Sequence, residues 1–321
     1  MAKIESIKTY TGQDLPNIFF RPMLQGENAI DLGFKVMYNM PVPTTLHFWK
    51  RSGNVLQKFT AGGFTGSNPA EKFQKEMPMA KVKAELAFGA EDYFGTVYEL
   101  LANTAGVNME DLSGTELEKA ETDLFKQNIA ESIRVTAWIG DTSKSGGFNA
   151  FNGILPSIVA GGEVTNHKSA WEFTASYTAA DLLAEVYAKA DDVLKQAKGE
   201  GQLAFFVTSD VYEAYTTYLM TQSAEAAFAY LQGGVKQPTY NGIPVIDMKI
   251  SGYLADTDLP ESIVLLTDRR NLALAVNTSD YPASEVRMWY NPDEMENRQR
   301  ATFLAGADYL LPELISYAAK A

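Results

Sequence analysis

The chain has 321 residues, of which 46% are hydrophobic, so it can bury a core large enough for one large domain or two smaller ones. It contains no cysteine, which excludes disulfides, thiolate metal sites and cysteine nucleophiles. The formal net charge of -13 argues against sequence-specific DNA binding, and fits either plain solubility or a container wall that must not grip nucleic acid.

The N-terminal residues 1–33 read as an arm, in which Pro16 and Pro22 bracket a short apolar stretch. This arm lacks the basic and apolar segments of a signal peptide, and nowhere does the chain approach 18 consecutive apolar residues. We therefore expect a protein that stays in the cytoplasm and has no contact with a membrane.

Residues 34–82 contain few helix signals, and Pro41 and Pro43 separate two stretches of strand composition, 34–38 and 45–50. A compact domain rarely contains so long a loop, so this segment predicts an extended two-stranded projection that buries its apolar side chains against other subunits. The alternative is that these aromatic residues fill the chain's own core. The side chains expected at inter-subunit contacts are Phe48, Trp49, Lys50, Arg51, Lys58, Phe59 and Phe64.

Residues 81–88 alternate polar and apolar, which predicts a half-buried strand, and 92–101 read as a helix. Ser113 and Glu116 match a capping box that opens a much longer helix, without Pro or Gly until Gly140. Its length is about 25 residues, or roughly 38 Å. We expect one apolar stripe along it, formed by Leu117, Ala120, Leu124, Ile129, Ile133 and Ala137, with Trp138 at its end. The expected solvated positions are Glu118, Lys119, Glu121, Asp123, Lys126, Glu131 and Arg134.

After Gly140 comes a loop rich in Gly, Ser and Asn that ends at Gly153, and further on Asn241-Gly242 predicts a turn. The expected helices are 179–198 with Thr178 as its N-cap, a helix from Ser209 or Asp210 to 220, and 224–231. The expected strands are 164–173 as a pair, 203–208, 262–267, 271–276, 285–290 and 298–309. Helices and strands do not alternate regularly, which indicates an α+β fold and argues against a doubly wound parallel sheet.

No catalytic motif accompanies these elements. The two histidines, His47 and His167, have no metal-ligand spacing, and no nucleophile elbow or phosphate loop is present. The acidic pairs 191–192 and 293–294 are more simply solvated surface than an acid/base pair. We expect no cofactor, no metal and no enzymatic activity.

The order of these elements resembles the major capsid protein of tailed bacteriophages, which has the Hong Kong 97-type fold. One part of the resemblance is the long helix that closes on residues 138–141 and is followed by a loop and 151–155. Another part is the later run of 205–212, 240–246 and 263–268, together with the ending from Arg300. Gly140, Gly153 and Gly242 would make the turns of this pattern.

The resemblance implies an N-terminal arm at 1–33, an extended loop at 34–82, and a peripheral domain at 83–163 and 283–321 with a spine helix at 114–139. Residues 164–282 would form the axial domain. It also implies self-assembly through hexamers and pentamers into an icosahedral shell that encloses double-stranded DNA. Portal protein, scaffolding or decoration proteins and non-specific contacts with packaged DNA would be its partners, in a virion assembled in the host cytoplasm.

Three other functions remain open at this point. An encapsulin-type nanocompartment shell protein would have the same fold, but the prolines make the N-terminal arm a poor amphipathic helix for cargo binding. A soluble carboxylate-dependent α+β enzyme belongs to a different class. A tail or fibre protein would show internal repeats and more β-structure.

Overall fold

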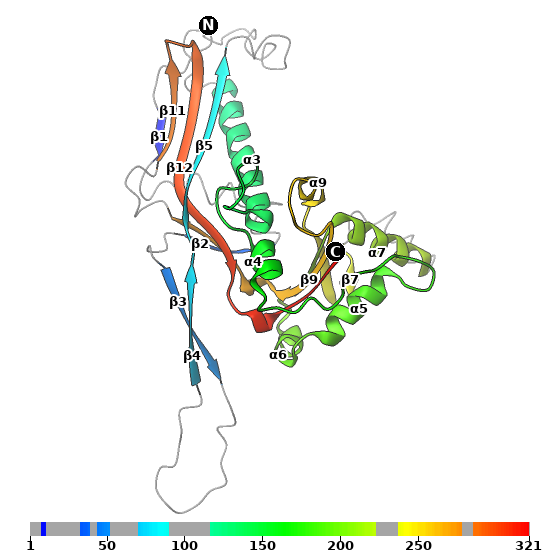
Figure 1. Cartoon of the computed structure of the whole chain (residues 1–321). Helices are drawn as coiled ribbons and strands as arrows, with labels where there is room; N and C mark the ends of the chain where they lie inside the picture. Colours follow the sequence, from blue (N-terminus) through cyan, green and yellow to red (C-terminus); the bar gives the residue numbers. More distant parts are fainter. Residues whose placement is uncertain are drawn as a thin grey trace, which may run out of the picture.

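The computed structural model describes residues 8–10, 33–38, 44–51, 70–89, 116–222, 237–277 and 285–320. The predicted helices at 92–101 and 224–231 and the predicted capping box at Ser113 lie outside these ranges, as do Lys58, Phe59 and Phe64. Within them the chain folds into two sheets, a long helix and a two-stranded ribbon (Figure 1).

The larger sheet has six strands. Five follow the order β1 (Lys8–Tyr10), β11 (Glu285–Asn291), β12 (Glu296–Tyr309), β10 (Leu272–Asn277) and β2 (Lys35–Tyr38), and β5 (Ala80–Gly89) also pairs with β12. All pairs are antiparallel except β10 with β2. Burial alternates along β5 from Lys81 to Phe88, which confirms the predicted half-buried strand.

The long helix α3 (Glu116–Ile139) packs against this sheet and ends one residue before Gly140, as predicted (Figure 1). The single apolar stripe, however, is wrong. Phe125 is buried where Leu124 is only half-buried, and from Ile129 onward nearly every residue is buried. Three positions expected to be solvated, Glu118, Glu121 and Arg134, are buried as well.

Arg134 shows why a charged residue can lie inside this part of the helix. Its guanidinium donates to the carbonyl oxygens of Met248, at 3.1 Å, and Lys249, at 3.2 Å. These carbonyls belong to the segment that leads into α9 (Ser251–Leu254). Burying a guanidinium costs much less free energy when its N–H groups are hydrogen-bonded than when they have no partner. The C-terminal half of α3 is therefore enclosed by both sheets.

The smaller sheet has the order β13 (Ile315–Lys320), β9 (Ser262–Asp268), β6 (Leu203–Val207), β8 (Ile243–Asp247) and β7 (Thr239–Tyr240). Its central strand β6 is buried on both faces. Phe205 points to the cluster formed with α5 (Ala179–Lys189) and α7 (Ser209–Gln222), and Phe206 points to the cluster around α3. This confirms the predicted buried strand at 203–208 and helix from 209.

Two other local predictions are wrong. Thr178 caps α5 in a full capping box, but the helix stops at Ala190, whose ψ of 149° is extended. Asp191 then accepts from the Val193 N–H and opens a separate short helix, α6 (Asp192–Gln196). Residues 164–173 do not form paired strands, and Asn166 makes only an isolated bridge to Tyr317.

The chain crosses between the two sheets three times, and Asn271 holds the last two of these crossings together. One crossing runs from β9 through the short turn η4 (Arg269–Asn271) to β10, and the other runs from β12 to β13. The buried amide of Asn271 donates to the Leu311 carbonyl and accepts from the N–H groups of Leu310 and Leu311. A side chain that satisfies three backbone groups in this way fixes the relative position of the sheets.

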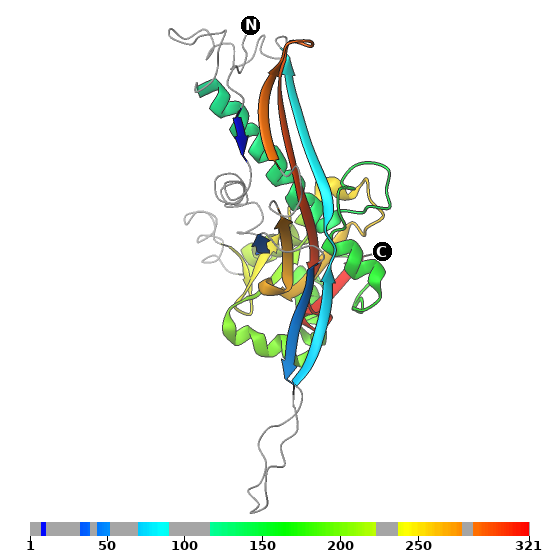
Figure 2. The ribbon, with the colours of Figure 1, turned by 90° about the vertical axis from the view of Figure 1, so that its left-hand side faces the viewer.

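Outside these sheets, β3 (Thr44–Arg51) and β4 (Ala70–Met77) pair antiparallel with each other over eight residues. This ribbon stands away from both sheets and points in the opposite direction from the upper end of α3 (Figures 1 and 2). Only Pro78 and Met79 separate β4 from β5, so the ribbon continues directly into the larger sheet.

Trp138 lies where α3, the smaller sheet and the segment before β2 meet. It is fully buried, and its ring centroid lies 4.8 Å from that of Phe34 and 5.4 Å from that of Phe206. Its indole N–H has no hydrogen-bond partner among the residues that the structure describes. The elements combine helix and mostly antiparallel sheet without regular alternation, which confirms the α+β class.

Replacing Trp138 with Ala should remove the contact shared by these three elements. We expect the free energy of unfolding to fall by about 3–5 kcal/mol, because the indole leaves a large cavity. Trp138→Phe should cost clearly less, since it keeps an aromatic ring and removes the unpartnered N–H. Urea unfolding followed by circular dichroism measures both, and equal losses would contradict this account.

Candidate assembly site

The end of α3 is closed by two glycines that approach each other more closely than side chains allow. The Gly153 N–H donates to the Gly140 carbonyl at 2.8 Å. A Cβ on Gly140 would lie 2.2 Å from the Phe151 carbonyl oxygen, and one on Gly153 would lie 2.7 Å from the Trp138 carbonyl oxygen. Real Cβ atoms do not make such contacts, so both positions require glycine.

Between these glycines the loop is organised by its own polar side chains. Asn152 accepts from the backbone N–H and the hydroxyl of Thr142, and Asp141 accepts from both donors of Ser143. The Ser143 hydrogen bonds lower the pKa of Asp141, so this residue is a carboxylate at neutral pH. Gly153 then serves as the N-cap of α4 (Ile154–Gly161), which packs against α3.

The base of the β3–β4 ribbon is fixed to β12 by a cation. Lys75 on β4 forms an ion pair with Asp308 at 3.1 Å, and its ammonium lies 3.5 Å from the centre of the Tyr309 ring. The Tyr309 hydroxyl in turn donates to Glu163 at 2.8 Å. Burial raises the pKa of Asp308, and Lys75 opposes that shift. Burial and Glu163 together raise the pKa of Tyr309.

An apolar contact and a second tight glycine complete this base. Met77 is buried against Ala273, Ala275 and Leu310. A Cβ on Gly306 of β12 would lie 2.0 Å from the Pro78 carbonyl oxygen, so the chain can pass from β4 to β5 only over a glycine. The ribbon is therefore held rigidly at one end.

The predicted turn at Asn241-Gly242 is present between β7 and β8. Asn241 has φ 50° and Gly242 has φ 77°, so both residues adopt the left-handed conformation that an Asn-Gly hairpin turn uses.

The structure places the other predicted site residues in two groups. Phe48, Trp49, Lys50 and Arg51 all lie in β3, although their side chains are outside the described part. Leu117, Leu124, Ile129, Ile133 and Trp138 all lie in α3, where the last three are buried, Leu124 is half-buried and the Leu117 side chain is not described. The two groups come from different parts of the molecule, and the helical group is core.

Sequence reasoning missed the base of the ribbon, which involves Lys75, Met77, Gly306 and Asp308. One usable signal was present, because a glycine inside an alternating strand such as 298–309 often marks a close approach of backbone. The Lys75–Asp308 pair had no local signal, since 233 positions of sequence separate its members.

The described residues show neither of two features that would point to another class of function. In those ranges, no cluster of three or more His, Cys, Asp or Glu side chains is placed to hold a metal ion. None of the helices in the same ranges combines the length and hydropathy needed to cross a bilayer.

No protein-family model matches the sequence, and no curated protein is similar to it in sequence. Solved structures, in contrast, share its fold. A chain from the procapsid of satellite phage P4, which includes the size determination (Sid) protein, has a TM-score of 0.62 at 10% identity, covering 97% of this chain and 92% of that one. A chain from Mycobacterium phage Ogopogo has a TM-score of 0.53 at 12% identity, covering 92% and 94%.

A third similar structure is the capsid of an empty GTA particle, with a TM-score of 0.51 at 12% identity and coverage of 93% and 91%. The matches span nearly the whole chain in each case, and they come from capsids and phages. The chain therefore has the fold of tailed-phage capsid proteins, which confirms the fold expected from the sequence resemblance.

Gly153→Ala should destabilise the end of α3. We expect the free energy of unfolding to fall by about 1–3 kcal/mol, because the new methyl group has no room beside the Trp138 carbonyl. Gly146→Ala, in the same loop, is the matched control, since a Cβ there meets nothing within 4 Å. Thermal unfolding of both variants measures the difference. If Gly146→Ala lost as much unfolding free energy as Gly153→Ala, the close approach of Gly153 to the end of α3 would not explain the loss.

Lys75→Met should leave the Asp308 carboxylate at the ribbon base without its cation. We expect a loss of about 1–3 kcal/mol of unfolding free energy at pH 7. The folded pKa of Asp308 is already raised, so its proton binds more tightly in the folded state, and the loss should shrink as the pH falls towards about 4.5. Urea unfolding at the two pH values tests this.

Lys83→Met is the control for the same measurement, because Lys83 pairs with Glu85 on an exposed part of β5. We expect it to change the unfolding free energy by no more than about 0.5 kcal/mol at either pH. A loss for Lys75→Met that did not depend on pH would show that Asp308 is not the group affected.

Proposed function

We propose that the chain is the major capsid protein of a tailed phage, which self-assembles into an icosahedral shell around double-stranded DNA. The observation that carries this proposal is the fold, which is shared over nearly the whole chain with capsid structures. A structural role is also consistent with a sequence that offers no catalytic motif.

The β3–β4 ribbon is the element that we assign to contacts between subunits. An isolated two-stranded ribbon is marginally stable in water, so a long one that stands away from its own domain needs partners. Its rigid base at Lys75 and Met77 fixes its direction, and a preset direction lowers the entropy lost when it binds a neighbour. We propose that it is the extended loop of a Hong Kong 97-type subunit.

The domain division that we propose follows the two sheets. The six-stranded sheet with α3 as spine helix would be the peripheral domain, and the five-stranded sheet with α5 and α7 the axial domain. Three strands cross the boundaries drawn from sequence, because β2 and β10 join the larger sheet and β13 the smaller. β1 adds to the edge of the larger sheet, as an N-terminal arm can.

Closed shells of this kind need heterologous contacts that form rings, so we expect hexamers and pentamers of this chain. Portal, scaffolding or decoration proteins and packaged DNA would be its further partners, and the virion its location. The net charge of -13 would keep contacts with DNA weak and non-specific.

Electron microscopy of the purified protein tests the proposal, with closed particles or rings of five or six subunits as the expected result. The ribbon can be tested separately by replacing residues 52–69 with Asn-Gly, which joins Arg51 to its partner Ala70 in a two-residue turn. This variant keeps Lys75 and Met77, so we expect it to fold but to form no shells.

The unfolding temperature of the shortened variant, measured beside that of the full chain, shows whether folding is intact. Shells formed by a folded variant would remove the ribbon from the assembly interface. A full chain that stayed a monomer under all assembly conditions would refute the capsid assignment itself.

A further inference from the structure

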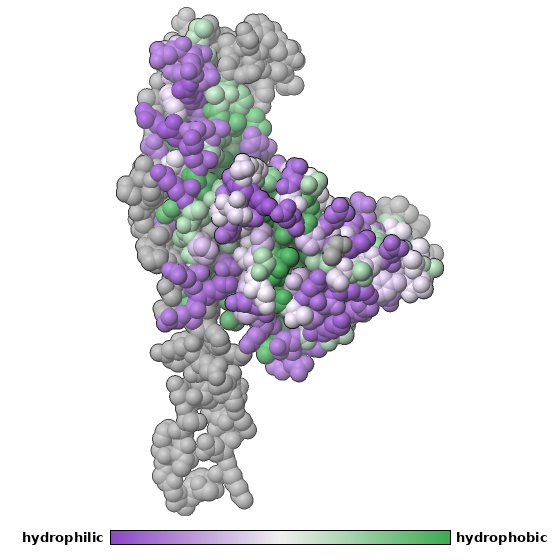
Figure 3. Space-filling view, viewed as in Figure 1, coloured by the Kyte–Doolittle hydropathy of each residue, from purple (hydrophilic) through white to green (hydrophobic). Residues whose placement is uncertain are grey.

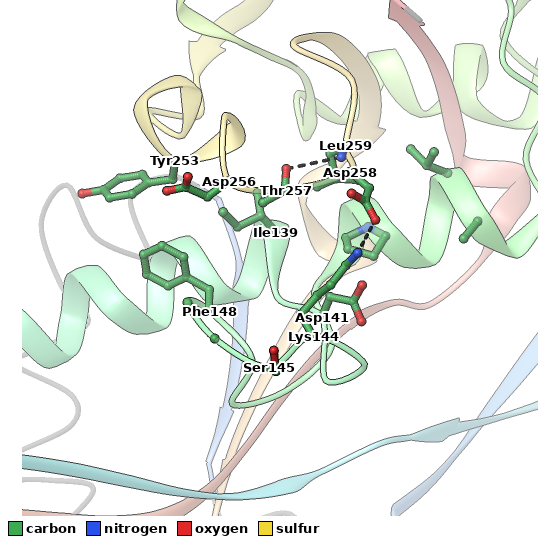
Figure 4. Close-up of a pocket in the computed structure, with 15 residues that line it drawn as sticks. Ile139, Asp141, Lys144, Ser145, Phe148, Tyr253, Asp256, Thr257, Asp258 and Leu259 are labelled. Carbon is green, nitrogen blue, oxygen red and sulfur yellow. Dashed lines mark hydrogen bonds and ion pairs between the residues drawn. The ribbon is translucent and has the colours of Figure 1, made fainter.

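A hollow of about 600 Å³ lies between the loop that follows α3 and the segment around α9, and we call it the α9 groove (Figure 4). Its apolar floor is built from both sides and includes Ile139, Phe148, Pro156, Val159, Tyr253 and Leu259. Figure 3 shows apolar atoms in green between α4 and the part of the molecule that carries the smaller sheet. This volume is within the range of about 300–1,000 Å³ that is typical of pockets for drug-sized ligands.

The walls of the α9 groove are tied to each other, so its shape exists before anything binds. Phe148 and Tyr253 meet edge to face with ring centroids 5.2 Å apart. The Lys144 ammonium donates to the Asp258 carboxylate across the groove (Figure 4). A preformed site loses little entropy on binding.

The rim of the α9 groove is acidic. Asp141, Asp256 and Asp258 line it against one cation, Lys144, which is already paired with Asp258. Asp141 is held as a carboxylate by the Ser143 donors, and Asp256 is exposed and forms no ion pair with any residue in the described ranges. An apolar floor under two carboxylates that form no ion pair in the described ranges suits an occupant that is aromatic and basic.

The chain itself contains one segment of that composition. Residues 32–70 include Lys35, Lys50, Arg51 and Lys58 but no acidic residue, in a chain that carries 40 of them. The link between β3 and β4, residues 52–69, contains Lys58 beside Phe59, and Phe64. This link is therefore complementary to the groove in both charge and hydrophobicity.

The β3–β4 ribbon and the α9 groove of one subunit lie in different directions. The β3–β4 ribbon leaves the body on the side away from α9 in both views, and Lys75 and Met77 hold its base (Figures 1 and 2). The residues of the link start at the far end of that ribbon, after Arg51. A second copy of the chain is the source that can bring the same segment to the groove.

We propose that the α9 groove binds the 52–69 link of a neighbouring copy, with an aromatic ring on the apolar floor and Lys58 facing Asp141 and Asp256. The proposal rests on the proposed shell function, and it names the contact through which the ribbon acts. Each subunit then donates one link and accepts another, which is the heterologous arrangement that closes into rings.

Disulfide trapping gives a direct test, because the chain contains no cysteine. In assembled K58C/D256C protein, mild oxidation should produce a reducible ladder of dimers and larger species on a denaturing gel. The control pair K58C/D192C places the second cysteine on the exposed start of α6, outside the groove, and should give no ladder. Equal ladders from both pairs would overturn the proposal, as would a cross-link confined to monomers.

Charge reversal provides a second test that does not depend on cysteine geometry. K58E and D256K should each lower the yield of particles about tenfold, since like charges then face each other, and the double variant should recover most of the loss. D192K, which makes the same change outside the groove, should assemble normally. Single variants that assemble like the wild type, or a double variant without rescue, would refute the docking.

The two proposals fail in different ways. If the unaltered chain forms neither shells nor rings, the capsid function is wrong. If it assembles but the α9 groove variants show neither the ladder nor the rescue, the shell function stands and only the groove assignment is wrong.

Discussion

The contact between Gly140 and Gly153 is the constraint on which much of this structure depends. Because neither residue has a side chain, the chain leaves α3, makes a twelve-residue excursion over 141–152 and returns to within hydrogen-bonding distance of the helix end. The return places α4 directly beside α3 and keeps the Trp138 carbonyl in contact with Gly153. It also projects the polar loop towards α9, where Phe148 and Lys144 meet Tyr253 and Asp258. The position of one wall of the α9 groove thus depends on the absence of a Cβ atom at Gly140 and at Gly153.

The same helix end unites the two sheets. Trp138 packs on Phe206 of the smaller sheet and on Phe34 at the entry to the larger one, while Asn271 ties two of the three chain crossings together. The Trp138 contact is apolar packing and the Asn271 contact is a set of hydrogen bonds from a buried amide, so each stabilises the junction independently of the other. The two sheets are therefore joined by apolar packing at one point and by hydrogen bonds at another.

Much of this architecture could be predicted from sequence where the determinants are local. Gly140 ended the long helix, Asn241-Gly242 made its turn, Thr178 capped α5 and the alternation at 81–88 gave a half-buried strand.

The errors have non-local causes. The apolar stripe of α3 failed at Arg134 because carbonyls from residues 248 and 249 satisfy it, and no periodicity in the helix reveals them. The break at Ala190 was missed because Asp191 can either continue a helix or cap a new one. Of the candidate site, a two-stranded projection with a strand at 45–50 was predicted, but its second strand β4 was not, and residues 34–38, expected in the projection, pair with β10 in the larger sheet instead. The Lys75–Asp308 base and the α9 groove were not predicted, since both join distant segments.

The distribution of charge connects these local features with assembly. Copies of a chain of net charge -13 repel each other as their surfaces approach within about 8–10 Å, because salt screens the repulsion only at larger separations. Association therefore needs places where the sign is reversed, and residues 32–70 supply one because they contain cations alone. Lys50 and Arg51 of this segment lie at the end of β3, in the ribbon, so the attraction they provide is available to a neighbour. The base at Lys75 uses one further cation to fix the direction in which the segment is presented. In the assembly that we propose, repulsion between the bodies and attraction by the ribbon would act on different surfaces, and together they would favour the orientation in which a ribbon reaches an acidic groove.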